Sequence, residues 1–272
     1  AAEDAGLPCL GTLPRLPELE IPSRHLGLQL ADEGEMKQRT ERAAEIVESY
    51  VDLSELLLRT RAEDPLPAAE TAAPMQADRP LRIAVARDAA FNFIYRENLS
   101  RLAQAGQLLF FSPLAGDPLP EADLVYFPGG YPELYARELA GREELKRQVR
   151  DYAEAGGRIL AECGGMIWLS KAIEGVEGGP FPMCGVLPFT ATMDGARLHM
   201  GYRRIVDGSG RSWRGHEFHY SSLTAPDALP SMAVQYNAAG EAVPTPLYRY
   251  KNVIAGYTHL YWGESDILYL WN

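Results

Sequence analysis

Residues 158–169 read RILAECGGMIWL, and this stretch decides the fold of the larger part of the chain. Its first four residues form a short apolar run typical of a buried parallel strand, and its last four have the character of a helix. The turn between them carries Cys163 beside Gly164 and Gly165. A nucleophile on a tight strand-to-helix turn needs small neighbours, and a helix N-terminus lowers the pKa of a thiol. The stretch predicts an α/β fold with Cys163 as a candidate nucleophile, although a lone cysteine beside Gly-Gly is more often structural.

The alternation of strand and helix continues on both sides of this stretch. Strand-like apolar runs occur at 82–86, 108–111 and 122–127, and helical patterning at 97–105 and 133–155. After Gly185 polar and apolar residues alternate instead, as at 202–206, 232–236 and 246–250. We therefore predict a mostly parallel, doubly wound sheet with antiparallel strands added in the C-terminal half.

A second glycine-containing turn, FPGGYPE at 127–133, also follows a strand and precedes a helix. Two glycines here would let backbone N–H groups face a carbonyl oxygen, as an oxyanion hole requires. Taken alone, the turn could be an ordinary glycine-rich loop. Because ligands bind at the carboxyl edge of such sheets, we expect both turns to meet at one site.

A cysteine nucleophile needs a base, and the chain has five histidines. His259 ends the strand-like run IAGYTH at 254–259 and is the candidate base. His216 and His219 have a spacing that could suggest a metal pair, but they lie on a strand-like segment without other ligands nearby in sequence. We therefore expect no metal site.

The N-terminal part has a different texture. We expect a buried strand at 7–13 and one helix from about Glu33 to Leu58, which together are too little for a core. Residues 1–60 are interpreted as the tail of a larger domain. Residues 61–80 are rich in Pro, Ala and acidic side chains and are interpreted as a linker, the alternative being a long surface loop.

Composition excludes several classes of protein. The 272 residues include 26 Lys+Arg and 37 Asp+Glu, a net charge of −11, which argues against nucleic-acid binding. No apolar run approaches the roughly 18 residues of a membrane span, and three cysteines are too few for a disulfide framework. We expect a soluble, cytoplasmic protein.

Several of these segments together resemble a known family. FPGGYPEL, AECGGM, RGHEFHYS and GYTH resemble the class I glutamine amidotransferase domain of the cobyrinic acid a,c-diamide synthases, and so does IAVARDAAFNFIYREN at 83–98. The region from Leu13 to Leu28 resembles the end of that family's N-terminal ATP-binding synthetase domain. The resemblance implies a synthetase remnant at 1–60, a linker at 61–80 and an amidotransferase domain at 81–272. No G-x-x-x-x-G-K-[ST] phosphate loop occurs in the chain.

The resemblance implies a role for individual residues. Cys163 would attack the amide of L-glutamine, His259 would be the base, and the N–H groups of Gly130 and Gly164 would hold the oxyanion. A further set would contact substrate or face the synthetase domain, namely Gly129, Tyr131, Tyr95, Asn98, His216, Glu217 and His219.

One departure from the wider class concerns the residue two positions after the base. Many class I amidotransferases have His-x-Glu, whereas this chain has His259-Leu260-Tyr261. The cobyrinate-type branch is known to lack that glutamate. The departure predicts sluggish glutamine hydrolysis without the partner domain, since a poorly oriented imidazole costs rate.

For the intact enzyme the resemblance implies a glutamine-dependent amidoligase. ATP and Mg²⁺ would activate the a and c acetate carboxylates of cobyrinic acid, and ammonia would convert them to amides in cobalamin biosynthesis. No cofactor is expected in this chain itself. Hydrogenobyrinate, nickel sirohydrochlorin and sirohaem remain alternative tetrapyrrole acceptors. A Cys-His hydrolase that does not use glutamine and a non-catalytic binding module are also open, as is a homodimer.

Overall fold

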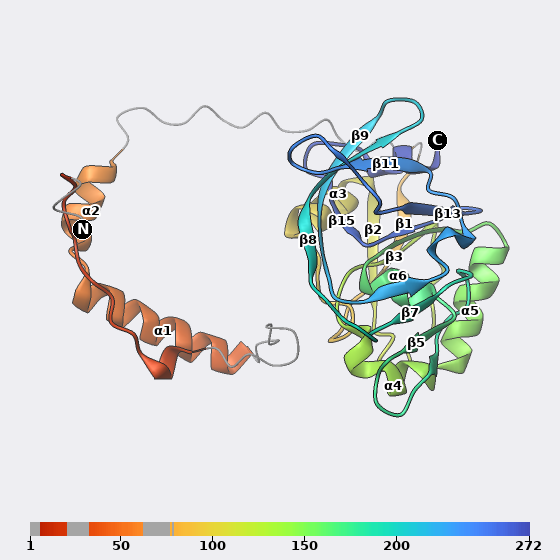
Figure 1. Ribbon diagram of the computed structural model, residues 1–272, viewed down its shortest axis with the longest axis horizontal. Coiled ribbons are helices and arrows are strands. Elements are labelled where there is room, and N and C mark those ends of the chain that lie inside the picture. Colours follow the sequence, from red (N-terminus) through yellow and green to blue (C-terminus); the bar gives the residue numbers. More distant parts are fainter. Residues whose placement is uncertain (1–5, 21–32, 62–76, 78) are drawn as a thin grey trace. The chain divides into compact units, whose positions relative to one another are not determined.

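The computed structural model describes residues 6–20, 33–61, 77 and 79–272 (Figure 1). Contacts divide the chain into two compact units, Ala1–Glu70 and Thr71–Asn272. Residues 21–32 and most of the predicted linker at 61–80 lie outside the described residues, and so do the sequence interpretations that concern them. Among those described, no helix combines the length and apolar character needed to cross a membrane.

The first unit contains a 3-10 helix, η1 (Pro17–Leu19), and two α-helices, α1 (Glu33–Tyr50) and α2 (Leu53–Thr60). The single helix expected here is wrong, because the Asp52 side chain accepts a hydrogen bond from Glu55 N and starts α2. The expected strand at 7–13 is also wrong. Its Gly11 forms one isolated bridge with Val51, and both Leu7 and Leu13 are more than half exposed.

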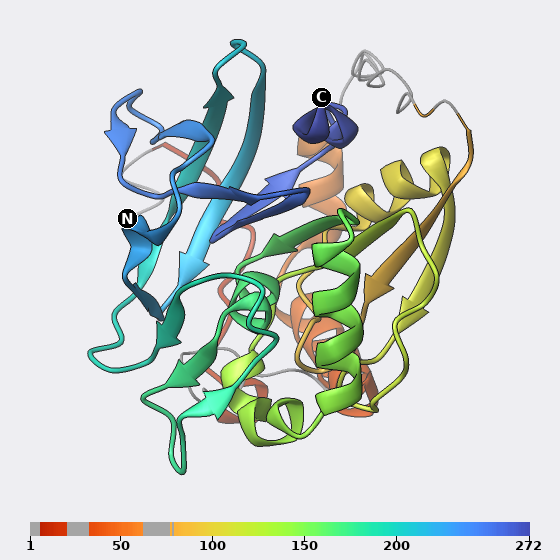
Figure 2. The same ribbon diagram turned by 90° about the vertical axis from the view of Figure 1, so that its right-hand side faces the viewer.

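The second unit is built on a mostly parallel sheet in the order β13-β14-β4-β3-β1-β2 (Figure 2). The strands are β1 (Leu81–Ala86), β2 (Gly106–Phe111), β3 (Leu124–Phe127), β4 (Arg158–Glu162), β13 (Leu247–Tyr250) and β14 (Val253–Gly256). All neighbours pair in parallel except β13, which pairs antiparallel with β14. The predicted α/β fold class is confirmed.

Alternate residues of these strands enter two cores, as the period of a strand requires. One core takes Val125 and Ile159, with residues of α4 (Ala136–Ala140), α5 (Glu143–Glu154) and α6 (Gly164–Leu169). The other takes Ile83 and Leu160, with residues of α3 (Arg96–Ala105) and η5 (Ile267–Trp271). The helix expected at 133–155 is instead three pieces, since η3 (Pro132–Tyr135) and α4 precede a break after Gly141.

Two antiparallel-rich sheets account for the alternating C-terminal texture. The larger has the order β12-β11-β8-β9-β15 and comprises β8 (His199–Asp207), β9 (Ser212–His219), β11 (Ala233–Tyr236), β12 (Ala242–Val243) and β15 (Thr258–Tyr261). The smaller has the order β10-β7-β5-β6 and comprises β5 (Ala172–Glu174), β6 (Phe181–Pro182), β7 (Thr190–Thr192) and β10 (Ser222–Thr224), with η4 (Pro226–Ala228) following. Tyr257 alone separates β14 from β15, so the chain passes there from the parallel sheet to the larger antiparallel one.

Candidate active site

Cys163 occupies the turn between β4 and α6 in a strained conformation. Its φ of 46° and ψ of −105° place a non-glycine residue where L-amino acids are rarely found, at a cost of about 1–3 kcal/mol. The backbone N–H of Cys163 donates to Gly256 O at 2.7 Å, and Ile167 N donates to Cys163 O at 3.0 Å. The first bond ties the cysteine turn to the neighbouring strand β14, and the second begins α6.

The two glycine-containing turns contact one another. A Cβ on Gly164 would lie 2.8 Å from Gly130 O and 2.9 Å from Gly130 N, closer than real Cβ atoms approach. The second turn is anchored in its own right, because Phe93 N donates to Gly129 O and Tyr131 N donates to Ala90 O, both at 3.0 Å. The structure therefore brings together the two residues predicted for an oxyanion hole.

His259 lies on β15 and packs against the same turn. A Cβ on Gly129 would lie 2.2 Å from Cε1 of His259, so only glycine leaves room for this ring. The imidazole also packs on Phe93, with ring centroids 4.6 Å apart, and on His216 at 4.9 Å. His259 is 4% exposed, and its Nδ1 has no hydrogen-bond partner among the described residues.

Burial keeps both candidate catalytic groups neutral at rest. It lowers the pKa of His259 to about 3, helped by His216 and His219. Burial also raises the pKa of the Cys163 thiol, and the nearby carboxyl of Glu133 raises it further, while a bond from Gly164 N–H opposes the shift. A neutral imidazole can accept a proton, but forming the thiolate needs electrostatic help.

Three further predicted residues surround His259 or Cys163. Tyr95 Oη and His216 Nδ1 are 2.5 Å apart, and His216 stacks on the His259 ring. Burial raises the pKa of Tyr95 to about 12 and lowers that of His216. Tyr131 is partly buried, and its pKa is raised by burial and then by Cys163.

Asn98 faces inward, and its expected role at the substrate or at the interface stays a prediction. Its side chain is fully buried, with Nδ2 donating to Leu260 O at 2.7 Å and Oδ1 accepting from Trp262 N at 2.9 Å. Asn98 therefore fastens α3 to the end of β15, the strand that carries His259.

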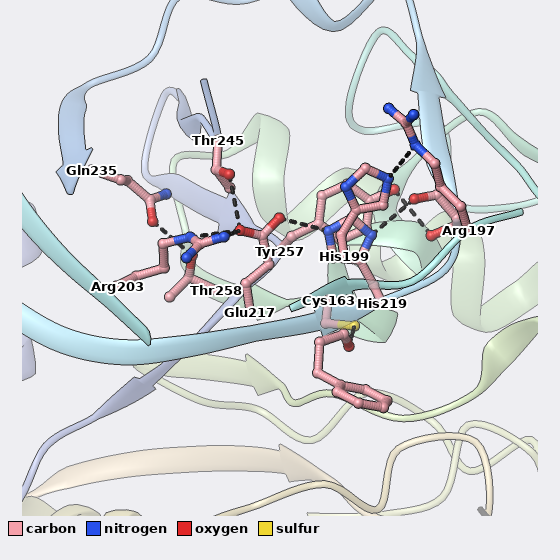
Figure 3. A network of polar contacts seen from close by, with 12 residues as sticks. Cys163, Arg197, His199, Arg203, Glu217, His219, Gln235, Thr245, Tyr257 and Thr258 are labelled. Carbon is pink, nitrogen blue, oxygen red and sulfur yellow. Dashed lines mark hydrogen bonds and ion pairs between the residues drawn. The ribbon is translucent and has the colours of Figure 1, made fainter. Parts of the chain in front are cut away.

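Glu217 and His219 belong to a buried network on β9 (Figure 3). The carboxylate of Glu217 contacts Arg203, Thr245 and His219. His216 lies on the opposite face of the same strand, because it is an odd number of residues from both. Within the described residues, no group of three or more His, Cys, Asp or Glu side chains could hold a metal ion.

Comparison with known proteins gives this arrangement a family. Residues 82–267 match the family model of the CobB/CobQ-like glutamine amidotransferase domain. The chain belongs to this family.

Curated relatives of this amidotransferase chain match nearly all of it. It is 36% identical over 265 residues to a hydrogenobyrinate a,c-diamide synthase of Brucella abortus biovar 1, covering 94% of this chain and 60% of that protein. It is 38% identical over 276 residues to a cobyrinate a,c-diamide synthase of Dehalococcoides mccartyi, covering 96% and 60%. The chain thus spans about 60% of the length of these relatives. Among solved structures, PurLQS of Thermotoga maritima overlaps 66% of this chain and 88% of its own, with a TM-score of 0.48 and 16% identity.

Sequence reasoning missed several residues that shape this amidotransferase site. Glu162 directly precedes Cys163 and accepts from Leu260 N at 3.1 Å and Tyr126 Oη at 2.8 Å, and burial raises its pKa to about 8. Glu133 is also buried, which raises its pKa to about 7. Glu162 and Glu133 both lie within motifs quoted from the sequence, so their position beside a strand-to-helix turn could have indicated them. Arg203 carries no such signal, because only the folded chain brings it to Glu217. Tyr257 lies in the quoted segment GYTH, but its stack on His219 is formed only in the folded chain.

Proposed function

We propose that residues 81–272 hydrolyse L-glutamine, with Cys163 as nucleophile and His259 as base. The observation that carries the proposal is that the cysteine turn and the ring of His259 both pack against the loop of Gly129 and Gly130. Gly164 brings the cysteine turn against Gly130, and Gly129 brings the same loop against the ring of His259. A nucleophile, a base and two backbone donors at one sheet edge are the groups that amide cleavage by a thiol requires.

The reaction follows from the protonation states of the site. Neutral His259 takes the proton of Cys163, and the thiolate attacks the side-chain amide carbon, forming the C–S bond. The N–H groups of Gly130 and Gly164 stabilise the resulting oxyanion. The imidazolium returns the proton to the leaving nitrogen as the C–N bond breaks and ammonia departs. Water activated by His259 then cleaves the thioester, releasing L-glutamate and restoring the thiol.

We also propose that the isolated chain is slow. Nδ1 of His259 has no partner in the part of the chain that the structure describes, and Tyr261 stands where His-x-Glu would place a carboxylate to orient the ring, and both observations support this. Gly129 and Tyr131 would contact the substrate. Tyr95 and His216 would form the outer wall over His259.

For the full-length enzyme we propose an ATP- and Mg²⁺-dependent amidoligase whose synthetase domain includes residues 1–60, joined by 61–80. Activation of a carboxylate as an acyl phosphate would let ammonia displace phosphate and form the amide. The names of the relatives support cobyrinate or hydrogenobyrinate as acceptor, amidated at its a and c side chains, over nickel sirohydrochlorin or sirohaem.

Release of L-glutamate by this chain tests the proposal, with Cys163→Ala beside the wild type. We expect slow release that Cys163→Ala lowers to background, and covalent labelling of Cys163 by a diazoketone analogue of L-glutamine. Cys9→Ala is the matched control, because Cys9 is exposed and should leave the rate unchanged. Release that survives Cys163→Ala would contradict the assignment. If a folded sample shows neither release of L-glutamate nor labelling of Cys163, a hydrolase with another substrate or a binding module is favoured.

A further inference from the structure

Both ring nitrogens of His219 contact oxygen atoms that can only accept. Nδ1 lies 2.8 Å from the backbone oxygen of Ser221, and Nε2 lies 2.7 Å from Oε1 of Glu217. A neutral imidazole carries one N–H, so one of these contacts would set a nitrogen lone pair against an oxygen lone pair. The two contacts are both hydrogen bonds only if His219 carries a proton on each nitrogen.

The alternative, a protonated Glu217, conflicts with the partners of its other oxygen. Oε2 accepts from Nη2 of Arg203 at 2.6 Å, from Nε of Arg203 at 2.7 Å and from Oγ1 of Thr245 at 2.9 Å. Despite its burial, contacts with His219, Thr245 and Arg203 lower the pKa of Glu217 to about 2. Glu217 is therefore a carboxylate, and with a proton on each nitrogen of His219 the cluster of Arg203, Glu217 and His219 would carry one net positive charge.

A second histidine, His199, stacks on His219 and differs from it in its hydrogen bonds and its protonation. The His199 ring lies parallel to His219, with centroids 5.0 Å apart, and its Nε2 accepts from Nε of Arg197 at 3.3 Å. Burial and then the neighbouring His219 and Arg197 lower the pKa of His199. His199 is thus the neutral member of the stack.

The other face of the His219 ring contacts a residue that is close to Cys163. His219 stacks on Tyr257, with centroids 3.5 Å apart and ring planes within 6° (Figure 3). Tyr257 follows Gly256, whose carbonyl holds the N–H of Cys163, and Tyr257 also interacts electrostatically with the thiol. Phe218, the neighbour of His219 on β9, accepts from Sγ of Cys163 at 3.9 Å.

The remaining ionisable groups near Cys163 oppose its ionisation. The carboxyl groups of Glu133, Glu162 and Glu217 each raise the pKa of the thiol. Tyr131 and Tyr257 are neutral phenols whose pKa values are themselves raised by burial. A fixed positive charge on His219 offsets these acidic neighbours without taking part in proton transfer.

We propose that His219 is a positioning residue that carries a proton on each ring nitrogen, donated to Glu217 and Ser221, and whose charge stabilises the thiolate of Cys163 across the ring of Tyr257. The inference rests on the proposed role of Cys163 as nucleophile. His259 accepts the thiol proton, and His219 supplies charge alone. The acidic composition of the cysteine's surroundings makes this charge necessary for a nucleophile at neutral pH.

The pH dependence of Cys163 alkylation by iodoacetamide, followed by mass spectrometry of the Cys163 peptide, tests this. In His219→Gln the amide keeps a donor toward Glu217 but loses the charge. We expect the thiol titration to move up by about one pH unit and the alkylation rate at pH 7 to fall about tenfold. His219→Lys restores the charge and should recover part of that rate. His199→Gln is the matched control and should follow the wild-type profile. A folded His219→Gln variant whose profile coincides with the wild type would overturn the proposal.

Nitrogen NMR of the wild-type chain with ¹⁵N-labelled histidine is an independent readout of the protons on each imidazole ring. We expect one imidazole, assigned to His219 by its loss in His219→Gln, to keep protons on both nitrogens at pH 8. A single protonated nitrogen there would overturn the inference. Failure of the proposed function gives a different result, because Cys163 would then react with neither glutamine nor the diazoketone while the His219 signal would be unchanged.

Discussion

The two faces of strand β9 hold their histidines by different means. On one face His216 stacks on His259, and the main constraints on the His259 ring are packing against Phe93 and Gly129. On the other face His219 has an acceptor on each nitrogen. Packing positions the ring of His259, and hydrogen bonds position the ring of His219.

The difference follows from what each ring has to do. An imidazole that moves a proton must be able to gain and lose it, and His259 is held by ring packing, with no acceptor for Nδ1 among the described residues that would retain a proton there. An imidazole that keeps its proton needs acceptors that would lose a hydrogen bond if it left. We call the face of β9 with His216 and His259 the packed face and the face with His219 the bonded face. The packed face is suited to proton transfer and the bonded face to a fixed charge. Substitutions on the packed face should therefore lower the rate, and substitutions on the bonded face should lower the stability.

The largest expected effect comes from changing the shape of the packed face. Gly129→Ala places a methyl group 2.2 Å from Cε1 of His259, so the ring must move by about an ångström. We expect the kcat of L-glutamine hydrolysis to fall about 100-fold, because a displacement of that size removes the reactive geometry. Gly141→Ala is the control, since its new methyl would make only ordinary contacts at 3.4 Å. Unchanged kcat in Gly129→Ala would show that packing does not set the position of His259.

The bonded face should fail through stability instead. Glu217→Gln leaves Arg203 and His219 without their shared carboxylate, and we expect the free energy of unfolding at pH 7 to fall by about 3 kcal/mol in urea denaturation. Glu154→Gln removes an exposed partner of Lys251 and should lower the free energy of unfolding far less, because solvent screens an exposed ion pair.

The comparison of the wild type with Glu217→Gln also gives a pH test. The pKa of Glu217 is lowered from about 4.5 to about 2, so its stabilisation is complete above pH 4.5 and is lost as the pH falls toward 2. The stability gap between wild type and Glu217→Gln should close over that window. A gap that stays constant down to pH 2 would contradict an ionised Glu217.

The parallel sheet could be predicted from sequence because short apolar runs between helical segments have few other solutions. The strands at 82–86, 122–127 and 158–161 lie within or overlap β1, β3 and β4. Helix ends were missed where a local feature interrupts the periodicity, such as the cap at Asp52 and the break after Gly141.

For the site, sequence spacing could nominate Cys163, His259 and the two glycine turns, since each lies at a strand end. It could not yield the Glu217 network. The partners Arg203 and Thr245 come from separate segments, and nothing in their local sequence indicates that they meet Glu217. The one available signal was the two-residue spacing of Glu217 and His219, which puts both on the same face of a strand.

The smallest expected effect would give the packed face a hydrogen bond of the kind found on the bonded face. Tyr261 lies two residues after His259 and so on the same face of β15. In Tyr261→Glu a carboxylate could accept from Nδ1 of His259, which would orient the ring and raise its pKa from about 3 toward the working range of a base. We expect a rise of about threefold to tenfold in the kcat of glutamine hydrolysis, with the low-pH limb of the rate profile moving to higher pH. Tyr261→Gln keeps the size of the new side chain without its charge and should leave the limb where it is. If both variants raise kcat equally, the gain comes from removing the tyrosine and not from the carboxylate. Packing alone would then orient His259 as well as a carboxylate does.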